Sequence, residues 1–554
     1  MKLLLTAVNA KYVHTNLALR YLHELCKDIC DTKLTEYSIN DNILSAERDI
    51  ILSKPDIIAF SCYIWNIEFI LKLAADVKKA LPHTVIVFGG PEVSFDAVQI
   101  LDKYPFVDYV VKGEGEISFP ALISYLCKTS SLPENGIAYR NNGEICDTPP
   151  AVLPDFSLIP FPYSEEIINE LNGRIIYYES SRGCPYSCKY CLSGEKGRVR
   201  FKNVADVKRD LKFFSDCKVT LVKFVDRTFN ADRRRAREIW EYIASLNTET
   251  RFHMEITGEL LDDETLELLK RVNPKNLQFE IGVQSTNPQT LSAIDRACHT
   301  DILFSNISRL LLETDIHIHL DLIAGLPFEN FDSFRTSFND VLSLNPHVLQ
   351  LGFLKLLKGS AMRVEADVHG MIYRDYSPYE IISNKYISAD EVLFLKDVDY
   401  VFDKFYNSAS FNKTFDYLFS VYSDKFSVFS DIVNFFREKS YINASFSKQR
   451  LYDVLYECFS HHGSAFEEAL RYDLIDSLHV GKLPSWCRTD NSFTSSDRVY
   501  GFLKNEEMKK KIIPQFAGRP AKSIIKHVRF EKFSYGILMF DYESGNVYDV
   551  SDYV

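Results

Sequence analysis

The chain has 554 residues, 46% of them hydrophobic, and a formal net charge of −12. This length exceeds what a single hydrophobic core supports, so we expect two or three domains. The acidic balance argues against a broad nucleic-acid-binding face, and no segment reaches the roughly 20 uninterrupted apolar residues of a membrane span. Most of the twelve cysteines are scattered without the spacing of a disulfide framework. We therefore expect free thiols and a cytoplasmic protein.

Residues 1–127 alternate apolar runs with amphipathic segments. KLLLTAVNA, PDIIAFSCYI and HTVIVFGGPE have the composition of buried strands, and IEFILKLAADVKKAL has the three- and four-residue apolar spacing of a helix. The alternation predicts a Rossmann-like parallel sheet with helices on both faces. Polar or glycine-rich segments follow four of the strands, at 9–15, 61–66, 89–93 and 113–116. Because ligands bind beyond the carboxyl ends of such strands, these segments predict a ligand-binding rim.

The rest of the chain divides into three parts. Residues 128–173 contain six prolines, which predicts a linker. Residues 174–369 repeat about six strand–helix units, which predicts an α/β partial barrel rather than a closed eight-fold one. Residues 370–554 are rich in Phe and Tyr and read as a mostly helical accessory domain, whose tail alternates like a β-hairpin with its turn at Ser544–Asn546.

The stretch SSRGCPYSCKYCLSG follows the first strand of the second series and carries Cys184, Cys188 and Cys191. Structural zinc and most ferredoxin-type clusters take four protein ligands. Zinc is the weaker alternative, because the candidate fourth ligands His253, His299, His317 and His319 lie far away in sequence. Three unliganded thiols in a loop would be prone to oxidation. The spacing therefore favours a [4Fe–4S] cluster with one iron left open.

The CxxxCxxC motif, with an aromatic residue before its last cysteine and a partial barrel behind it, resembles the radical S-adenosylmethionine (SAM) family over residues 174–365. The resemblance implies that SAM binds the open iron and is cleaved to a 5′-deoxyadenosyl radical. Strand-end segments similar to those of the family imply that SAM is contacted by Tyr190, Asp226, Glu280, Gln284, Ser285 and Gly325. The segment at 224–229 lacks the Gly-Gly-Glu of many members.

The strand ends of the first domain, FSCYIWN, VFGGPE and VVKGEGE, resemble the cobalamin-binding domain of B12-dependent radical SAM enzymes. No Asp-x-His-x-x-Gly motif is present, so the resemblance implies cobalamin without a histidine ligand. The implied contacts are Asn9, Tyr12, Ser61, Cys62, Tyr63, Trp65, Gly89, Gly90, Pro91, Glu92, Gly113, Glu114 and Gly115. A methylthiotransferase-like second cluster is the rival interpretation, but Cys62, Cys127 and Cys146 do not fall at corresponding strand ends.

These resemblances imply methylation of an unactivated carbon through methylcobalamin and a 5′-deoxyadenosyl radical. Oxidation or cyclisation without methyl transfer is an open alternative, and a cobalamin- or redox-sensing protein is a weaker one. The implied partners are a small-molecule, lipid or peptide substrate and an external electron donor of the flavodoxin or ferredoxin type.

Overall fold

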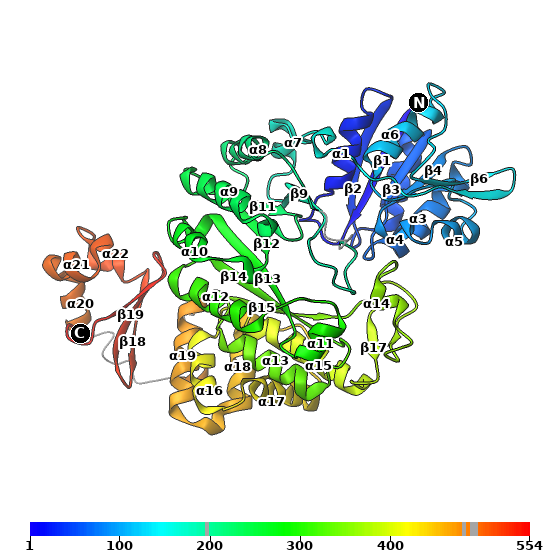
Figure 1. The fold of residues 1–554 in the computed structure, drawn as a ribbon. Coiled ribbons are helices and arrows are strands. Elements are labelled where there is room, and N and C mark those ends of the chain that lie inside the picture. The colour runs from blue at the N-terminus through cyan, green and yellow to red at the C-terminus, as the bar shows by residue number, and fades with distance from the viewer. Residues whose placement is uncertain (194–198, 479–482, 488–496) are drawn as a thin grey trace. The chain divides into compact units, whose positions relative to one another are not determined.

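The computed structural model describes residues 1–193, 199–478, 483–487 and 497–554. The chain forms two compact units, Met1–Val392 and Leu393–Val554. The first unit contains two large sheets built mainly of parallel strands, and the second contains a helical bundle followed by a small antiparallel sheet (Figure 1). No described helix combines the length and apolar character that crossing a membrane requires.

The first sheet has seven strands in the order β2-β1-β3-β4-β5-β6-β7, and its first five strands are parallel. In this order the strand sequence reverses between β1 and β3, which is the point where doubly wound sheets bind their ligands. The strands are β1 (Lys2–Asn9), β2 (Asp31–Ser38), β3 (Ile57–Ser61), β4 (Val85–Gly89), β5 (Tyr109–Val111), β6 (Ile137–Asn141) and β7 (Glu144–Asp147).

Helices cover both faces of this sheet. Helices α1 (Leu17–Cys26) and α6 (Gly115–Leu126) pack on one face through residues such as Leu19 and Phe119. The other face carries α2 (Ile43–Ser53), α3 (Ile67–Ala80) and α5 (Ala97–Lys103), with the short α4 (Pro91–Ser94) at the end of β4. The predicted Rossmann-like domain is therefore confirmed.

The proline-rich segment 128–173 is more ordered than a linker. Strands β6 and β7 lie inside it and extend the first sheet in antiparallel fashion. The interpretation of these residues as linker is wrong for 137–147, because prolines at 133, 149 and 150 flank the hairpin instead of interrupting it. The segment then continues to α7 (Glu165–Glu170).

The second sheet has six parallel strands in sequential order from β8 to β15, which is the predicted partial barrel. Burial alternates residue by residue along β13 and β14, so that apolar side chains face the helices and polar ones face the barrel interior. The strands are β8 (Ile176–Tyr178), β11 (Leu221–Phe224), β12 (Arg251–Ile256), β13 (Leu277–Gln284), β14 (His317–Ala324) and β15 (Val348–Phe353), and the outer helices are α8 (Val204–Asp216), α9 (Arg233–Ser245), α10 (Asp263–Leu269), α11 (Pro288–Ala293), α12 (Thr300–Glu313) and α13 (Phe331–Ser343).

The cysteine loop leaves β8 and is held at both ends. Strands β9 (Ser181–Arg182) and β10 (Arg200–Phe201) pair across its base. The segment formed by α14 (Ala361–Val364), β16 (Ile372–Tyr373) and β17 (Ile381–Ser383) packs on its other side, where the Met362 N–H donates to the Lys189 carbonyl at 2.9 Å.

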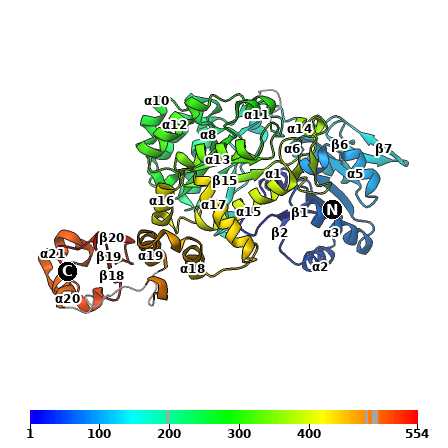
Figure 2. The same ribbon diagram turned by 90° about the horizontal axis from the view of Figure 1, so that it is seen from below.

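The second unit begins with packed helices, among which α16, α18 and α19 are neighbours (Figure 2). The helices are α15 (Ala389–Phe405), α16 (Asn412–Val421), α17 (Lys425–Glu438), α18 (Lys448–Phe459), α19 (Ser464–Leu478), α20 (Asp497–Lys504), α21 (Glu506–Ile512) and α22 (Ala521–Ile524). The tail forms three antiparallel strands, β18 (Val528–Phe533), β19 (Gly536–Asp541) and β20 (Asn546–Asp549). It has one strand more than the predicted hairpin, because Phe533 and Gly536 pair across a second tight turn.

Candidate functional site

The three motif cysteines line one cavity of about 220 Å³ inside the mouth of the barrel. All three are free thiols, and burial raises the pKa of Cys188 even though the neighbouring Arg296 lowers it. Within the described ranges, no group of three or more His, Cys, Asp or Glu is arranged to hold a single metal ion. A cubane cluster, whose irons each take one thiolate, needs no such convergence on one point.

Carboxylates form the opposite wall of this cavity, the cysteine cavity, through Glu255, Glu280 and Asp321. Glu280 contacts His253 Nε2 at 2.9 Å and Lys223 Nζ at 3.3 Å. Burial opposes its ionisation, but these two partners lower the pKa of Glu280 to about 2. Burial and then the charge of Glu280 raise the pKa of Asp321, and burial raises that of Glu255. The cavity thus holds one ionised carboxylate, Glu280, and two carboxyl groups whose pKa burial raises, with Arg227 Nη1 lying 3.8 Å from Glu255 and opposing that shift.

Arg296 is a cavity residue that no sequence motif indicates. Its Nη1 lies 3.9 Å from Cys188 Sγ, and its Nη2 donates to the carbonyl of Gly282. Its Nε is buried without a hydrogen-bond partner among the described residues. It stands alone in the loop after α11, so the sequence offers no signal that would have found it. Arg227, Thr228, Glu255 and Asp321 also line the cavity without having been predicted.

The six predicted SAM contacts fall into two groups. Tyr190, Glu280 and Gln284 line the cysteine cavity. Ser285 and Gly325 do not: Ser285 Oγ donates to Glu329 at 2.6 Å, and the Gly325 carbonyl accepts from Asn384 Nδ2 at 2.9 Å. Through these hydrogen bonds both residues hold neighbouring segments together and do not face the cysteine cavity.

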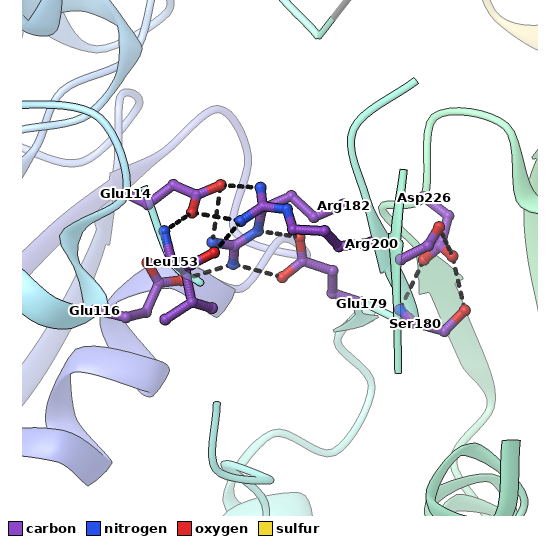
Figure 3. Close-up of polar contacts among 9 residues, drawn as sticks. Glu114, Glu116, Leu153, Glu179, Ser180, Arg182, Arg200 and Asp226 are labelled. Atoms are coloured by element: carbon purple, nitrogen blue, oxygen red, sulfur yellow. Dashed lines mark hydrogen bonds and ion pairs between the residues drawn. The ribbon is translucent and has the colours of Figure 1, made fainter. Parts of the chain in front are cut away.

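Asp226 likewise lies outside the cysteine cavity. It is completely buried and accepts hydrogen bonds from Ser180 N–H at 2.8 Å, Ser180 Oγ at 2.7 Å and Ser181 Oγ at 2.5 Å. It therefore holds the backbone and hydroxyls at the start of the cysteine loop (Figure 3).

A second cavity, of about 370 Å³, opens at the strand ends of the first domain. We call it the first-domain cavity. Its depth is apolar, with Leu19, Leu22, Val87, Val111 and Phe119. Eight of the predicted cobalamin contacts form its rim or wall, namely Ser61, Tyr63, Gly89, Gly90, Pro91, Gly113, Glu114 and Gly115.

The glycines of this rim serve two purposes. Gly90 and Gly113 have φ of +110° and +71°, and a Cβ there would lie 2.6 Å and 2.5 Å from backbone oxygens, so the turn itself requires glycine. A Cβ on Gly89 or Gly115 would meet only ordinary contacts of 3.6 Å and 3.7 Å. The backbone therefore does not require glycine at these two positions, and the absence of side chains there leaves space in the cavity.

The other predicted cobalamin contacts lie elsewhere. Cys62 and Glu92 are buried, and Glu92 pairs with Lys358 Nζ at 3.1 Å. Tyr12 is 72% exposed and lies against the Arg174 guanidinium. Asn9 and Trp65 line a third cavity.

This third cavity, of about 580 Å³, lies between the two domains of the first unit and is called the interdomain cavity here. The first domain contributes Trp65 and Tyr63, whose rings stack with centroids 4.4 Å apart, and also His14. The barrel contributes Tyr177, whose hydroxyl lies 2.7 Å from His14 Nδ1, and Lys223.

The interdomain cavity shares lining residues with each of the other two cavities. Arg227 and Glu255 line both the cysteine cavity and the interdomain cavity. Tyr63, Glu116 and Arg182 line both the interdomain and the first-domain cavity. The interdomain cavity thus adjoins both the cysteine cavity and the first-domain cavity.

Three family models match the chain. The model described as "B12 binding domain" matches residues 3–123, "Radical SAM superfamily" matches 178–341, and "Protein of unknown function (DUF4080)" matches 367–554. They correspond to the two sheets of the first unit and to the C-terminal region.

Among curated proteins, the chain is 27% identical to the cobalamin-dependent radical SAM methyltransferase TokK of Streptomyces tokunonensis, over 54% of this chain and 47% of that protein. It is 26% identical to the 2-(S-pantetheinyl)-carbapenam-3-carboxylate methyltransferase of Streptantibioticus cattleyicolor, over 53% and 46%. It is 25% identical to an anaerobic magnesium-protoporphyrin IX monomethyl ester cyclase of a Synechocystis species, over 42% and 48%. The chain spans about half the length of these relatives.

Among solved structures, the fold is similar to that of the cobalamin-dependent SAM radical enzyme OxsB, with a TM-score of 0.62 over 86% of this chain and 81% of that one. It is also similar to the radical SAM methyltransferase TsrM of Kitasatospora setae, with a TM-score of 0.56 over 68% and 79%. Sequence identity is 15% in both cases, so this likeness concerns the fold.

Proposed function

Because the chain is a radical SAM protein that carries a B12-binding domain, we propose that it is a cobalamin-dependent methyltransferase acting on an unactivated carbon. When bound, the [4Fe–4S] cluster with SAM supplies a carbon-centred radical and cobalamin supplies a methyl group. The protein's part is to hold these groups in the right places and to exclude water from the space between them.

The residues of the cysteine cavity fit a cluster and SAM. Cys184, Cys188 and Cys191 would hold the cluster and leave one iron without a protein ligand. The carboxyl groups of the cavity favour the cationic sulfonium and ammonium groups of SAM, since burial and the neighbouring carboxylates raise the pKa of Asp321 and a cation beside it would offset them. The unpartnered Nε of Arg296 suits a carboxylate.

The first-domain cavity fits cobalamin by shape. Its apolar depth between α1, α6 and the sheet suits an aromatic base, and Gly89 and Gly115 leave its entrance open. We propose that Ser61, Tyr63 and the glycine rim hold the cobalamin there.

The observation that carries the proposal is the shared walls of the three cavities. A substrate in the interdomain cavity would face the cysteine cavity across Arg227 and Glu255, and the first-domain cavity across Tyr63 and Arg182. The stacked Tyr63 and Trp65 rings provide an apolar wall for it. We propose a small-molecule, lipid or peptide substrate, an external donor of the flavodoxin or ferredoxin type, and a cytoplasmic location.

The test is an anaerobic incubation of the reconstituted protein with SAM carrying a deuterated methyl group, cobalamin, a reductant and a metabolite extract of the source cells. We expect deoxyadenosine together with a product that carries the labelled methyl group. A triple variant of Cys184, Cys188 and Cys191 to alanine is the control and should form neither. Deoxyadenosine with a consumed substrate but no labelled product would refute methylation and favour the second candidate, a ring-forming or oxidising reaction, which the cyclase among the relatives supports.

A further inference from the structure

Arg182 connects the cysteine loop to the first domain. It lies in β9, two residues before Cys184, and its Nη2 contacts Glu116 Oε1 at 2.6 Å. Glu116 belongs to the first turn of α6, on the other domain. On its own side, Arg182 is held by Glu179, with Nε and Nη2 each 2.8 Å from a carboxylate oxygen (Figure 3).

A second arginine strengthens the same connection. Arg200, in β10, contacts Glu114 through Nη1 at 2.8 Å and donates to the Leu153 carbonyl at 2.6 Å. Arg182 Nη1 lies 3.6 Å from the same Glu114. Both strands at the base of the cysteine loop are therefore tied to the residue that precedes α6 and to its first turn.

The network is buried and its charges are not fully balanced. No side chain among its three carboxylates and two guanidinium groups is more than 19% exposed. Burial raises the pKa of Glu179 even though Arg182 lowers it. Buried charges must stay paired, because removing one partner leaves the other charge uncompensated. The base of the cysteine loop and the start of α6 therefore cannot separate without exposing these charges.

The same residues border the first-domain cavity and lie next to the cysteine motif in sequence. Glu114 and Glu116 line the first-domain cavity next to Gly113 and Gly115, and Arg182 lines it too. Between Arg182 and Cys184 stands only Gly183, with φ of +100°. One ion pair and two peptide bonds therefore connect the start of α6 to the first cysteine.

We propose that Arg182 is a positioning residue that makes cobalamin binding and cluster assembly depend on each other. This inference rests on the proposed function, since it takes the first-domain cavity as the cobalamin site. Because linkage is reciprocal, a cluster that orders the cysteine loop tightens cobalamin binding by the same factor by which cobalamin tightens the cluster.

The test is a titration with hydroxocobalamin, followed by its absorbance, of the full-length protein before and after reconstitution with iron and sulfide. We expect the dissociation constant to fall by at least about five-fold when the cluster is present. In R182Q this ratio should approach one. In E116Q it should also decrease, because E116Q removes the charged partner of Arg182 in α6 and leaves Glu114 and Glu179 in place. The ratio is informative even if a variant weakens cobalamin binding in both states.

R174Q is the matched control. Arg174 makes an ion pair with Glu36 of the first domain at 2.9 Å and lines neither cofactor cavity. R174Q should keep the wild-type ratio. A ratio near one in the wild type, an unchanged ratio in E116Q, or an equal loss in R174Q would overturn the inference while leaving the proposed function intact. Absence of hydroxocobalamin binding in every form would overturn both.

Discussion

Replacing Asp226 by alanine tests whether this residue supports the cysteine loop or contacts SAM. The carboxylate accepts three buried hydrogen bonds, and the nearby Arg235, 6% exposed, has Nε and Nη1 without hydrogen-bond partners among the described residues. Each bond to a charged group contributes about 1.5–3 kcal/mol, offset by the desolvation that raises the pKa of Asp226. We expect D226A to lower the free energy of unfolding by about 4 kcal/mol, as for removal of one partner of a buried charge pair.

The measurement is urea unfolding of the iron-free protein, followed by tryptophan fluorescence in a W65F/W486F background. Of the three tryptophans in the chain, only Trp240 then remains, and it packs inside the barrel against Phe229. D232A is the control: the exposed Asp232 caps α9, and its loss should cost about 1 kcal/mol. Equal stability of D226A and wild type, or full cluster uptake with weakened SAM binding alone, would refute the supporting role.

Three further changes test the cavities and their surroundings. Burial raises the pKa of Glu329 to about 7 from an ordinary 4.5, so between these pH values the native state holds a proton that the unfolded chain has lost. The contribution of Glu329 to the free energy of unfolding therefore falls by about 3 kcal/mol as pH rises from 4.5 to 7. E329Q should abolish this fall, which urea midpoints measured between pH 5 and 8 would show. R296Q removes a cation from Cys188 and should lower the cluster's reduction potential by up to about 60 mV in a titration followed by electron paramagnetic resonance, whereas an unchanged potential would contradict the contact. G115L should weaken hydroxocobalamin binding at least about tenfold by filling the first-domain cavity, while G501A, whose Cβ meets nothing within 4 Å, should not.

The fold was predictable because local patterns specify it. Apolar runs alternating with amphipathic helices indicate a parallel sheet whatever the side chains at its strand ends, and both sheets of the first unit follow this rule. The exceptions were short strands. Residues 137–147 lie between prolines and form a hairpin only because the exposed edge of β5 accepts it, which is a tertiary contact that no local pattern contains.

Part of the lining of the cysteine cavity was predictable from position in the chain. Glu280 and Gln284 reach the cavity from β13 because barrel strands converge, and Tyr190 reaches it from the cysteine loop itself. The same reasoning misplaced Asp226, since a carboxylate at a strand end can turn toward the cavity or back toward the neighbouring strand. The two serines of SSRGC, which complete its hydrogen bonds, decide between these orientations.

Arg182 and Arg296 could not have been found from the sequence, for different reasons. Arg182 lies inside the cysteine motif, but its partner Glu116 is 66 residues away, and only the packing of two domains brings them together. Arg296 belongs to no motif, and only the folded structure shows that its Nη1 lies 3.9 Å from Cys188 Sγ. A motif can indicate which residues hold a cofactor, because those residues share a loop. The partners of its charged residues come from other elements, as Glu116 does for Arg182, so the motif alone cannot indicate what those charges do.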